Sequence, residues 1–146
     1  MMTVQAKGFD FLAGRWRVTN IRPDGEFPGT AECRPLFGGA GNVEEIDFPT
    51  RGFRGATLRL YDPARDEWTL HWADSRTGRL ALPMTGRFGA DGTGVFHGED
   101  EVDGVRVGCR FVWSVIGPDT ARWEQAYADD QGTWETNWIM QFVRIT

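Results

Sequence analysis

The sequence is poor in lysine, cysteine and histidine: of its 146 residues only Lys7, two cysteines and two histidines belong to these types, and its formal net charge is −5. Without a basic cluster to offset this charge, the composition argues against non-specific nucleic-acid binding. The longest apolar runs are far too short to span a bilayer, and the first residues lack the basic and apolar regions of a secretion signal. We therefore expect a cytoplasmic protein with no nucleic-acid and no membrane partner.

The two cysteines, Cys33 and Cys109, do not form a Cys-x-x-Cys pair, and no histidine stands at metal-ligand spacing from either. This pattern favours two buried thiols in a reducing compartment, although the sequence alone does not exclude a disulfide between them. The glycine-rich segment 38–41 lacks the Lys-Ser/Thr of a phosphate-binding loop, and no serine triad or dinucleotide fingerprint is present. We expect neither a metal nor a cofactor.

What the chain does contain is 19 glycines, 7 tryptophans and 10 phenylalanines. Glycine-rich turns with aromatic residues between them are typical of antiparallel β-structure. Turn signals recur at fairly even intervals, and Asp103-Gly104 is the best candidate for a two-residue hairpin.

Between the turns, apolar and polar residues alternate with a period of two, which predicts strands rather than helices. Only the stretch before Gly14 favours a short helical turn, and we expect one domain over residues 1–146. The predicted strands are 14–22, 28–37, 43–49, 54–62, 66–75, 79–88, 94–102, 105–116, 120–128 and 134–145.

The alternation also predicts which side chains share a face. On the last strand, Trp134, Trp138, Phe142 and Arg144 have one parity, whereas the inward parity of strands 43–49 and 94–102 stays open. Arg110 and Glu124 have the parity opposite to their aromatic neighbours. We expect those two residues to form an outward cross-strand ion pair.

The ends of the chain indicate how such strands would be arranged. A Gly14-Arg15-Trp16 sequence begins the first strand and Arg144 ends the last, so that the guanidinium could stack on the indole. This pairing would make the first and last strands neighbours and leave no unpaired edge. The fold class that we predict is an all-β, closed antiparallel up-and-down barrel of about ten strands, with a two-sheet sandwich as the alternative.

The motifs on which a family resemblance rests are Phe9-Asp10-Phe11-Leu12-Ala13-Gly14-Arg15-Trp16, Leu58-Arg59-Leu60-Tyr61-Asp62-Pro63, Trp72-Ala73-Asp74-Ser75, Arg122-Trp123-Glu124-Gln125-Ala126 and Trp134-Glu135-Thr136-Asn137-Trp138. The first resembles the N-terminal signature of the calycin superfamily, and together they resemble bacterial lipocalin-like proteins of an uncharacterised family. The resemblance implies a lipocalin-like barrel and no particular reaction. Within the superfamily, nitrobindins imply haem held by a histidine, but neither His71 nor His97 lies on the closing strand where that ligand is expected.

A barrel of more than eight strands has room for a cavity, and aromatic walls with a few polar groups are typical of small-molecule sites. We therefore predict that a small apolar or aromatic ligand binds in the barrel interior. The predicted ligand-binding residues are Trp72, Asp74, Phe111, Trp113, Trp123, Gln125, Tyr127 and Trp138, with Asn137 a further polar neighbour of outward parity.

Two other functions fit the same fold. A cyclase or isomerase would use the interior as a water-excluding site, with Asp74 as its acid or base. A non-catalytic scaffold would instead use outward apolar residues of the last strands as a homodimer interface. Those residues are Val112, Ile139, Val143 and Ile145.

Overall fold

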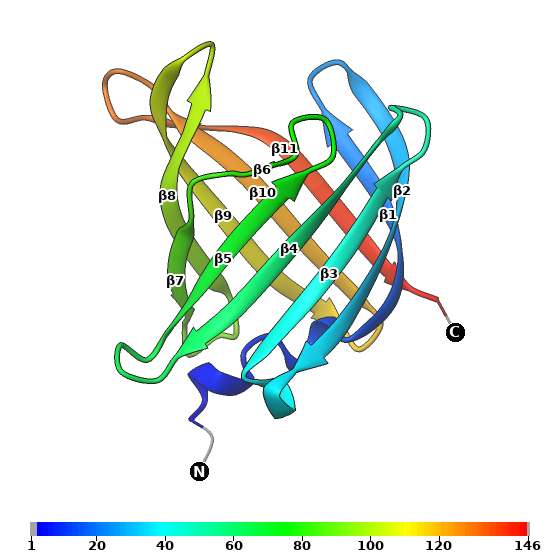
Figure 1. Cartoon of the computed structure of the whole chain (residues 1–146), viewed down its shortest axis with the longest axis vertical. Coiled ribbons are helices and arrows are strands. Elements are labelled where there is room, and N and C mark those ends of the chain that lie inside the picture. Colours follow the sequence, from blue (N-terminus) through cyan, green and yellow to red (C-terminus); the bar gives the residue numbers. More distant parts are fainter. Residues whose placement is uncertain (1–2, 146) are drawn as a thin grey trace.

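The computed structural model describes residues 3–145, most of which lie in β-strands (Figure 1). The strands are β1 (Gly14–Arg22), β2 (Gly25–Leu36), β3 (Gly41–Phe48), β4 (Phe53–Asp62), β5 (Glu67–Asp74), β6 (Arg79–Leu80), β7 (Met84–Phe88), β8 (Gly94–Val102), β9 (Val105–Gly117), β10 (Thr120–Ala128) and β11 (Trp134–Arg144). All except β6 form a closed ten-stranded antiparallel barrel, which confirms the predicted fold class.

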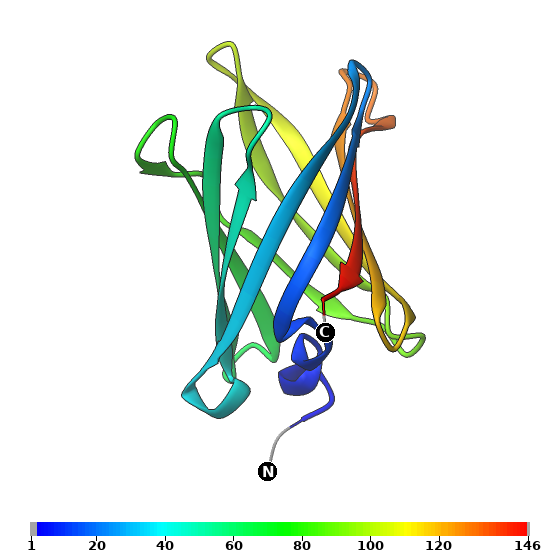
Figure 2. The same ribbon diagram turned by 90° about the vertical axis from the view of Figure 1, so that its right-hand side faces the viewer.

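The barrel closes between the first strand and the last. β1 pairs with β11 from Trp16 opposite Arg144 to Ile21 opposite Ile139, and β4 pairs with β5 on the other side of the ring. Figure 2 shows β1 and β11 side by side. This closure leaves no long unpaired edge at the point where an open sheet would begin and end.

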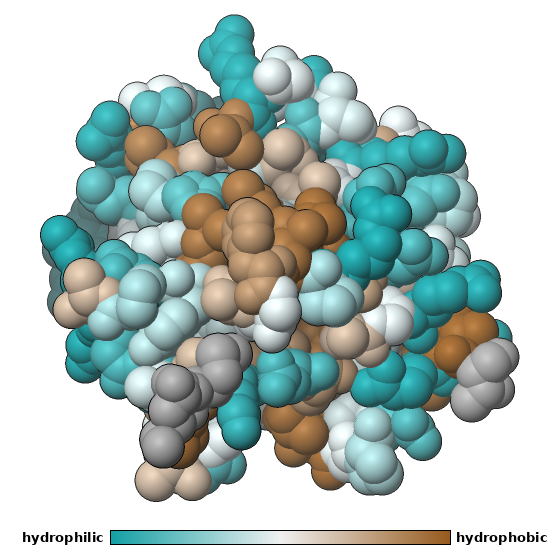
Figure 3. Space-filling model, turned by 60° about the horizontal axis from the view of Figure 1, so that its bottom comes forward, coloured by the Kyte–Doolittle hydropathy of each residue, from teal (hydrophilic) through white to brown (hydrophobic). Residues whose placement is uncertain are grey.

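One end of the barrel, here called the closed end, is covered by the N-terminal segment. The 3-10 turns η1 (Gln5–Lys7) and η2 (Asp10–Leu12) lie across it (Figures 1 and 2), as expected for the stretch before Gly14. Apolar side chains gather in the middle of this end, as Figure 3 shows. None of the helical turns within residues 3–145 has the length and apolar character needed to cross a membrane.

The opposite end, here called the hairpin end, carries the β1–β2, β3–β4, β8–β9 and β10–β11 connections (Figure 1). The β8–β9 connection is the predicted two-residue hairpin. Asp103 and Gly104 have φ values of 51° and 80°, the left-handed conformations that this tight turn requires. Glycine adopts this conformation without strain, which explains why Asp-Gly is a strong hairpin signal.

The predicted strand 79–88 is wrong in one respect, because the structure divides it into β6 and β7. Pro83 lies between the two, and proline cannot donate a ladder hydrogen bond. β7 therefore begins at Met84, and its pairing with β5 covers only Trp68 to Leu70. The part of β8 beyond His97 pairs with β9 alone.

The predicted common parity of the last strand is also wrong at its start. The register of β10 and β11 shifts between Gln125 and Ala126, so that Asn137 is an extra residue in β11. A bulge of this kind reverses the facing of every residue beyond it. Trp134 consequently lies on the outer wall, where its ring centre is 5.7 Å from the ring of His97 and 4.8 Å from the Arg110 guanidinium.

The expected ion pair between Arg110 and Glu124 is not formed. Glu124 accepts a hydrogen bond from Arg122 at 3.0 Å instead, and it lies opposite Val112 in the ladder. Arg110 stacks on Trp134, which the bulge has brought to the same outer face. Arg110 lies opposite Ala126, so that it is two positions away from Glu124 in the β9–β10 ladder.

Candidate functional site

The barrel interior has two unlike halves. Toward the closed end, Trp16, Trp68 and Phe96 are fully buried in a packed core. Toward the hairpin end, four inward-facing aromatic side chains are only partly buried. They are Trp72, Phe111, Tyr127 and Trp138. These side chains are therefore less completely covered than those of the packed core. We call this half the upper interior and define it by Trp72, Phe111, Trp123, Gln125, Tyr127, Asn137 and Trp138.

Aromatic rings form a continuous wall of the upper interior. Trp123 lies between Phe111 and Trp138, with ring centres 5.1 Å and 5.5 Å away, and both contacts are edge-on. Trp138 also lies 5.8 Å from Phe48 of β3. Edge-on packing fixes these large rings in place. Trp123 is buried, whereas Phe111 and Trp138 are half-buried.

Polar groups interrupt the aromatic wall at one place. Gln125 donates a hydrogen bond to the Asn137 side-chain oxygen at 2.9 Å, because the bulge turns Asn137 toward β10. Within residues 3–145, the oxygen of Gln125 and the amide nitrogen of Asn137 have no other side-chain or backbone partner. They leave one acceptor and one donor beside the rings of Trp123 and Trp138.

Trp138 is held in position by a second polar contact. Its indole nitrogen donates to the buried Asn20 side chain at 3.0 Å, and Asn20 donates to the backbone oxygen of Phe27 at 3.2 Å. Buried amide groups need such partners to offset their desolvation. The contact therefore fixes the indole plane that faces the upper interior.

Two carboxylates near the hairpin end are already engaged. Asp100 accepts a hydrogen bond from the Tyr127 hydroxyl, and burial together with this contact raises the pKa of Tyr127. Asp74 accepts two hydrogen bonds from the Arg76 guanidinium, at 3.0 Å and 2.7 Å. These bonds hold the pKa of Asp74 below its usual range, so that it is ionised and paired.

A glycine on the neighbouring strand β4 makes room for the ring of Trp72. A Cβ atom added to Gly55 would lie 1.8 Å from the ring of Trp72, so that the indole packs directly against the β4 backbone. Only glycine permits this close approach.

The structure thus brings together most of the predicted ligand-binding residues, with two exceptions. Trp113 is only 3% exposed and lies in the packed half, where its ring centre is 5.2 Å from Phe142. Asp74 lies at the margin, paired with Arg76. Neither histidine faces inward: His71 contacts Thr69 on the outer face, and His97 lies beside Trp134.

A buried charged group that the sequence did not indicate lies lower in the barrel. Arg59 of β4 forms an ion pair with Glu44 of β3, and it donates to the Asn42 side-chain oxygen at 2.9 Å. Arg59 is 3% exposed and Glu44 is 4% exposed. On β4 the polar residue Arg59 faces inward while Leu58 faces outward, which is the reverse of the usual arrangement of apolar residues inside and polar residues outside. The Arg59–Glu44 ion pair can therefore be identified only from the β3–β4 register.

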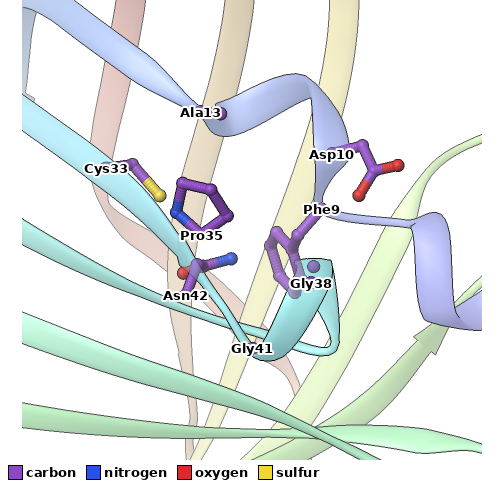
Figure 4. A pocket seen from close by; sticks show the side chains of 9 residues that line it. Phe9, Asp10, Ala13, Cys33, Pro35, Gly38, Gly41 and Asn42 are labelled. Carbon is purple, nitrogen blue, oxygen red and sulfur yellow. The ribbon is translucent and has the colours of Figure 1, made fainter.

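A pocket of about 350 Å³ lies beside this group at the closed end (Figure 4). It is lined by Phe9, Asp10, Ala13, Cys33, Pro35, Gly38, Gly39, Gly41 and Asn42. The Phe9 ring points from the N-terminal segment toward Asn42 and Gly41, as Figure 4 shows. The volume of the pocket is near the lower end of the range for small-molecule sites. Within residues 3–145, no group of three or more histidine, cysteine or acidic side chains is arranged to hold a metal ion.

Both cysteines are free and buried, and we expect both thiols to be unreactive in the folded protein. Burial raises the pKa of Cys33 to about 11 and that of Cys109 to about 12, and the thiolate is the reactive form. At pH 8, the thiol reagent DTNB should therefore modify neither cysteine in buffer and both in denaturing urea. Rapid native labelling of Cys33 alone, located by mass spectrometry, would show instead that the closed-end pocket admits the reagent.

Comparison with known proteins places the fold. No family model and no curated protein sequence matches the chain. The S-type phycobiliprotein lyase CPES from Guillardia theta has a similar structure, with a TM-score of 0.61 and 13% identity over 94% of this chain and 90% of the lyase. The two proteins thus have the same kind of fold, a closed antiparallel β-barrel.

Two designed proteins have a similar barrel. A redesigned β-barrel matches with a TM-score of 0.53 and 11% identity, covering 99% of each chain. A de novo fluorescence-activating β-barrel matches with a TM-score of 0.51 and 16% identity, covering 98% of this chain and 100% of the design. At these identities the likeness concerns the fold alone.

Proposed function

We propose that this ten-stranded barrel binds a small, largely apolar or aromatic molecule in the upper interior. The observation that carries the proposal is the partial exposure of aromatic side chains that face into the barrel, namely Trp72, Phe111, Tyr127 and Trp138. Apolar surface inside a barrel that remains open to solvent is stabilised when a guest molecule covers it.

The wall also provides a means of orienting such a guest. Apolar contacts with Phe111 and Trp138 would supply most of the binding free energy, because aromatic rings have large contact areas. The free oxygen of Gln125 and the free nitrogen of Asn137 would select a molecule with a matching donor and acceptor. The similar phycobiliprotein lyase and fluorescence-activating design support the proposal through their common fold.

The neutral fluorophore N-phenyl-1-naphthylamine provides a test, because its emission rises in an apolar site. We expect saturable enhancement with the wild-type protein and a dissociation constant at least about tenfold higher for Trp138→Ala, which removes a central aromatic contact. Trp134→Ala is the matched control, since Trp134 lies on the same strand but on the outer wall. That variant should bind within about twofold of wild type.

Urea denaturation of each variant distinguishes loss of binding from loss of folding, and Phe111→Leu provides a second, milder change in the same wall. Equal binding by wild type and Trp138→Ala would place the fluorophore elsewhere. Absence of enhancement in the folded wild-type protein would contradict a ligand site in the upper interior.

The alternative functions have less support. An enzyme that uses Asp74 as its acid needs a raised pKa, whereas Arg76 lowers the pKa of this residue and binds both of its oxygens. A homodimer through Val112, Ile139, Val143 and Ile145 remains a prediction, and Val143 is 47% exposed. Our proposal also retains the predicted cytoplasmic location, in which both thiols stay reduced.

A further inference from the structure

Several arginines place their guanidinium groups over aromatic rings that face into the barrel. The pairs are Arg22 over Trp138, Arg51 over Phe27, Arg59 over Phe9 and Trp113, Arg76 over Phe53, and Arg144 over Trp16. Most of these arginines also have an acidic partner. The ion pairs are Arg51–Asp24, Arg59–Glu44, Arg76–Asp74 and Arg144–Asp119. Within residues 3–145, Arg22 alone of this set has none.

Arg22 is the last residue of β1, and its parity there is that of Trp16, Val18 and Asn20, all of which face inward. Its guanidinium carbon lies 4.6 Å from the ring centre of Trp138. The residue is only partly exposed. Its charge therefore lies at the hairpin end of the upper interior, against a ring that we assign to the ligand site.

The groups around Arg22 leave its charge available. Asp24, in the following turn, is hydrogen-bonded to Arg51 at 3.1 Å. Tyr127 of β10 is protonated and donates a hydrogen bond to Asp100 of β8, so that this carboxylate also has a donor. Asp74 is bound by Arg76. Asp24, Asp100 and Asp74 thus each have a donor of their own, and a further carboxylate at this end, Glu135 opposite Tyr127, is exposed to solvent.

We propose that the ligand of the upper interior is an aromatic carboxylate and that Arg22 binds its carboxylate group. This inference rests on the proposed function. Guanidinium and carboxylate match in shape and can form two parallel charge-assisted hydrogen bonds. The aromatic part of the ligand would then lie against Trp138 and Phe111, while its charged group stays near the solvent-exposed end, where its desolvation is least costly.

Displacement of bound N-phenyl-1-naphthylamine by 1-naphthoate and by 1-naphthamide tests the proposal. These two competitors have nearly the same shape, but only the first carries a negative charge. We expect the wild-type protein to prefer 1-naphthoate by about tenfold, as a charge-assisted hydrogen bond allows. The preference should shrink as the salt concentration rises.

The Arg22→Gln variant should lose this preference and bind both competitors about equally. Because the preference is a ratio of two affinities in the same protein, it can be read whatever the affinity of the variant for the neutral fluorophore. Arg17→Gln is the matched control, because Arg17 is on the same strand with the outward parity, and it should keep the preference. If the fluorophore binds but both competitors displace it equally, or if Arg22→Gln keeps the preference, the inference fails and the proposed function stands. If the fluorophore itself does not bind, both fail.

Discussion

Replacing Trp16 with alanine should lower the free energy of unfolding by about 3–5 kcal/mol, the range found for large buried aromatic residues. Trp16 is 1% exposed and packs edge-on against Phe142, 6.0 Å away. Removing its indole would leave a cavity that the surrounding strands cannot close. The loss should be among the largest for any single substitution in this chain.

The indole does more than fill space. Its nitrogen donates to the backbone oxygen of Leu12 at 2.8 Å, and the Arg144 guanidinium lies 4.2 Å above its ring. Arg144 in turn donates to the backbone oxygens of Ala13 at 2.6 Å and Phe11 at 2.9 Å. Trp16 thus links the first strand, the last strand and the N-terminal segment that covers the closed end.

Equilibrium denaturation in urea, followed by circular dichroism, measures this effect. Trp134→Ala is the control, because it removes the same side chain from the outer wall, and we expect it to cost less than about 1 kcal/mol. Similar losses for both variants would contradict the role assigned to Trp16 in closing the barrel.

Much of this fold could be predicted because the signals that specify it are local. The alternation of Trp68, Leu70 and Trp72 depends only on the geometry of a strand, and Asp103-Gly104 depends only on the geometry of a turn. The closing contact between Trp16 and Arg144 could be predicted because both residues lie at chain ends that a barrel must bring together.

The errors arose where pairing between strands overrides local pattern. The bulge at Asn137 is a property of the β10–β11 ladder, and it moved Trp134 to the outer wall and brought Asn137 to Gln125. Glu44 and Arg59 were missed because each looks like a surface residue until the register shows that they face one another inside the barrel.

The same distinction applies to the candidate site. Parity indicated that Trp113 and Phe111 face inward together, and they do. How far each residue lies from the closed end determines that Trp113 belongs to the packed half while Phe111 faces the upper interior. That position depends on the tilt of the strands and on where the N-terminal segment covers the barrel. The unpaired charge of Arg22 became visible only when the acidic partners of the other stacked arginines were known.

The second large effect that we expect is the loss of about 3–5 kcal/mol of stability in Glu44→Leu, because the substitution leaves the Arg59 charge buried and unpaired. The energy of the pair itself is a separate quantity, since burying both charges also has a desolvation cost.

Comparing this single variant with a double variant separates these contributions. In Glu44→Leu/Arg59→Met no buried charge remains, and we expect this variant to recover most of the stability that Glu44→Leu loses. Recovery should stop short of wild type by about 1–2 kcal/mol, because Asn42 loses the donor to its side-chain oxygen. Glu45→Gln, one residue along β3, is the control: its partner Arg34 lies 3.8 Å away on the exposed outer face, so that the change should cost less than about 0.5 kcal/mol. If Glu44→Leu is as mild as this control, or if the double variant is less stable than Glu44→Leu, then Arg59 is not held as a buried charge that depends on Glu44.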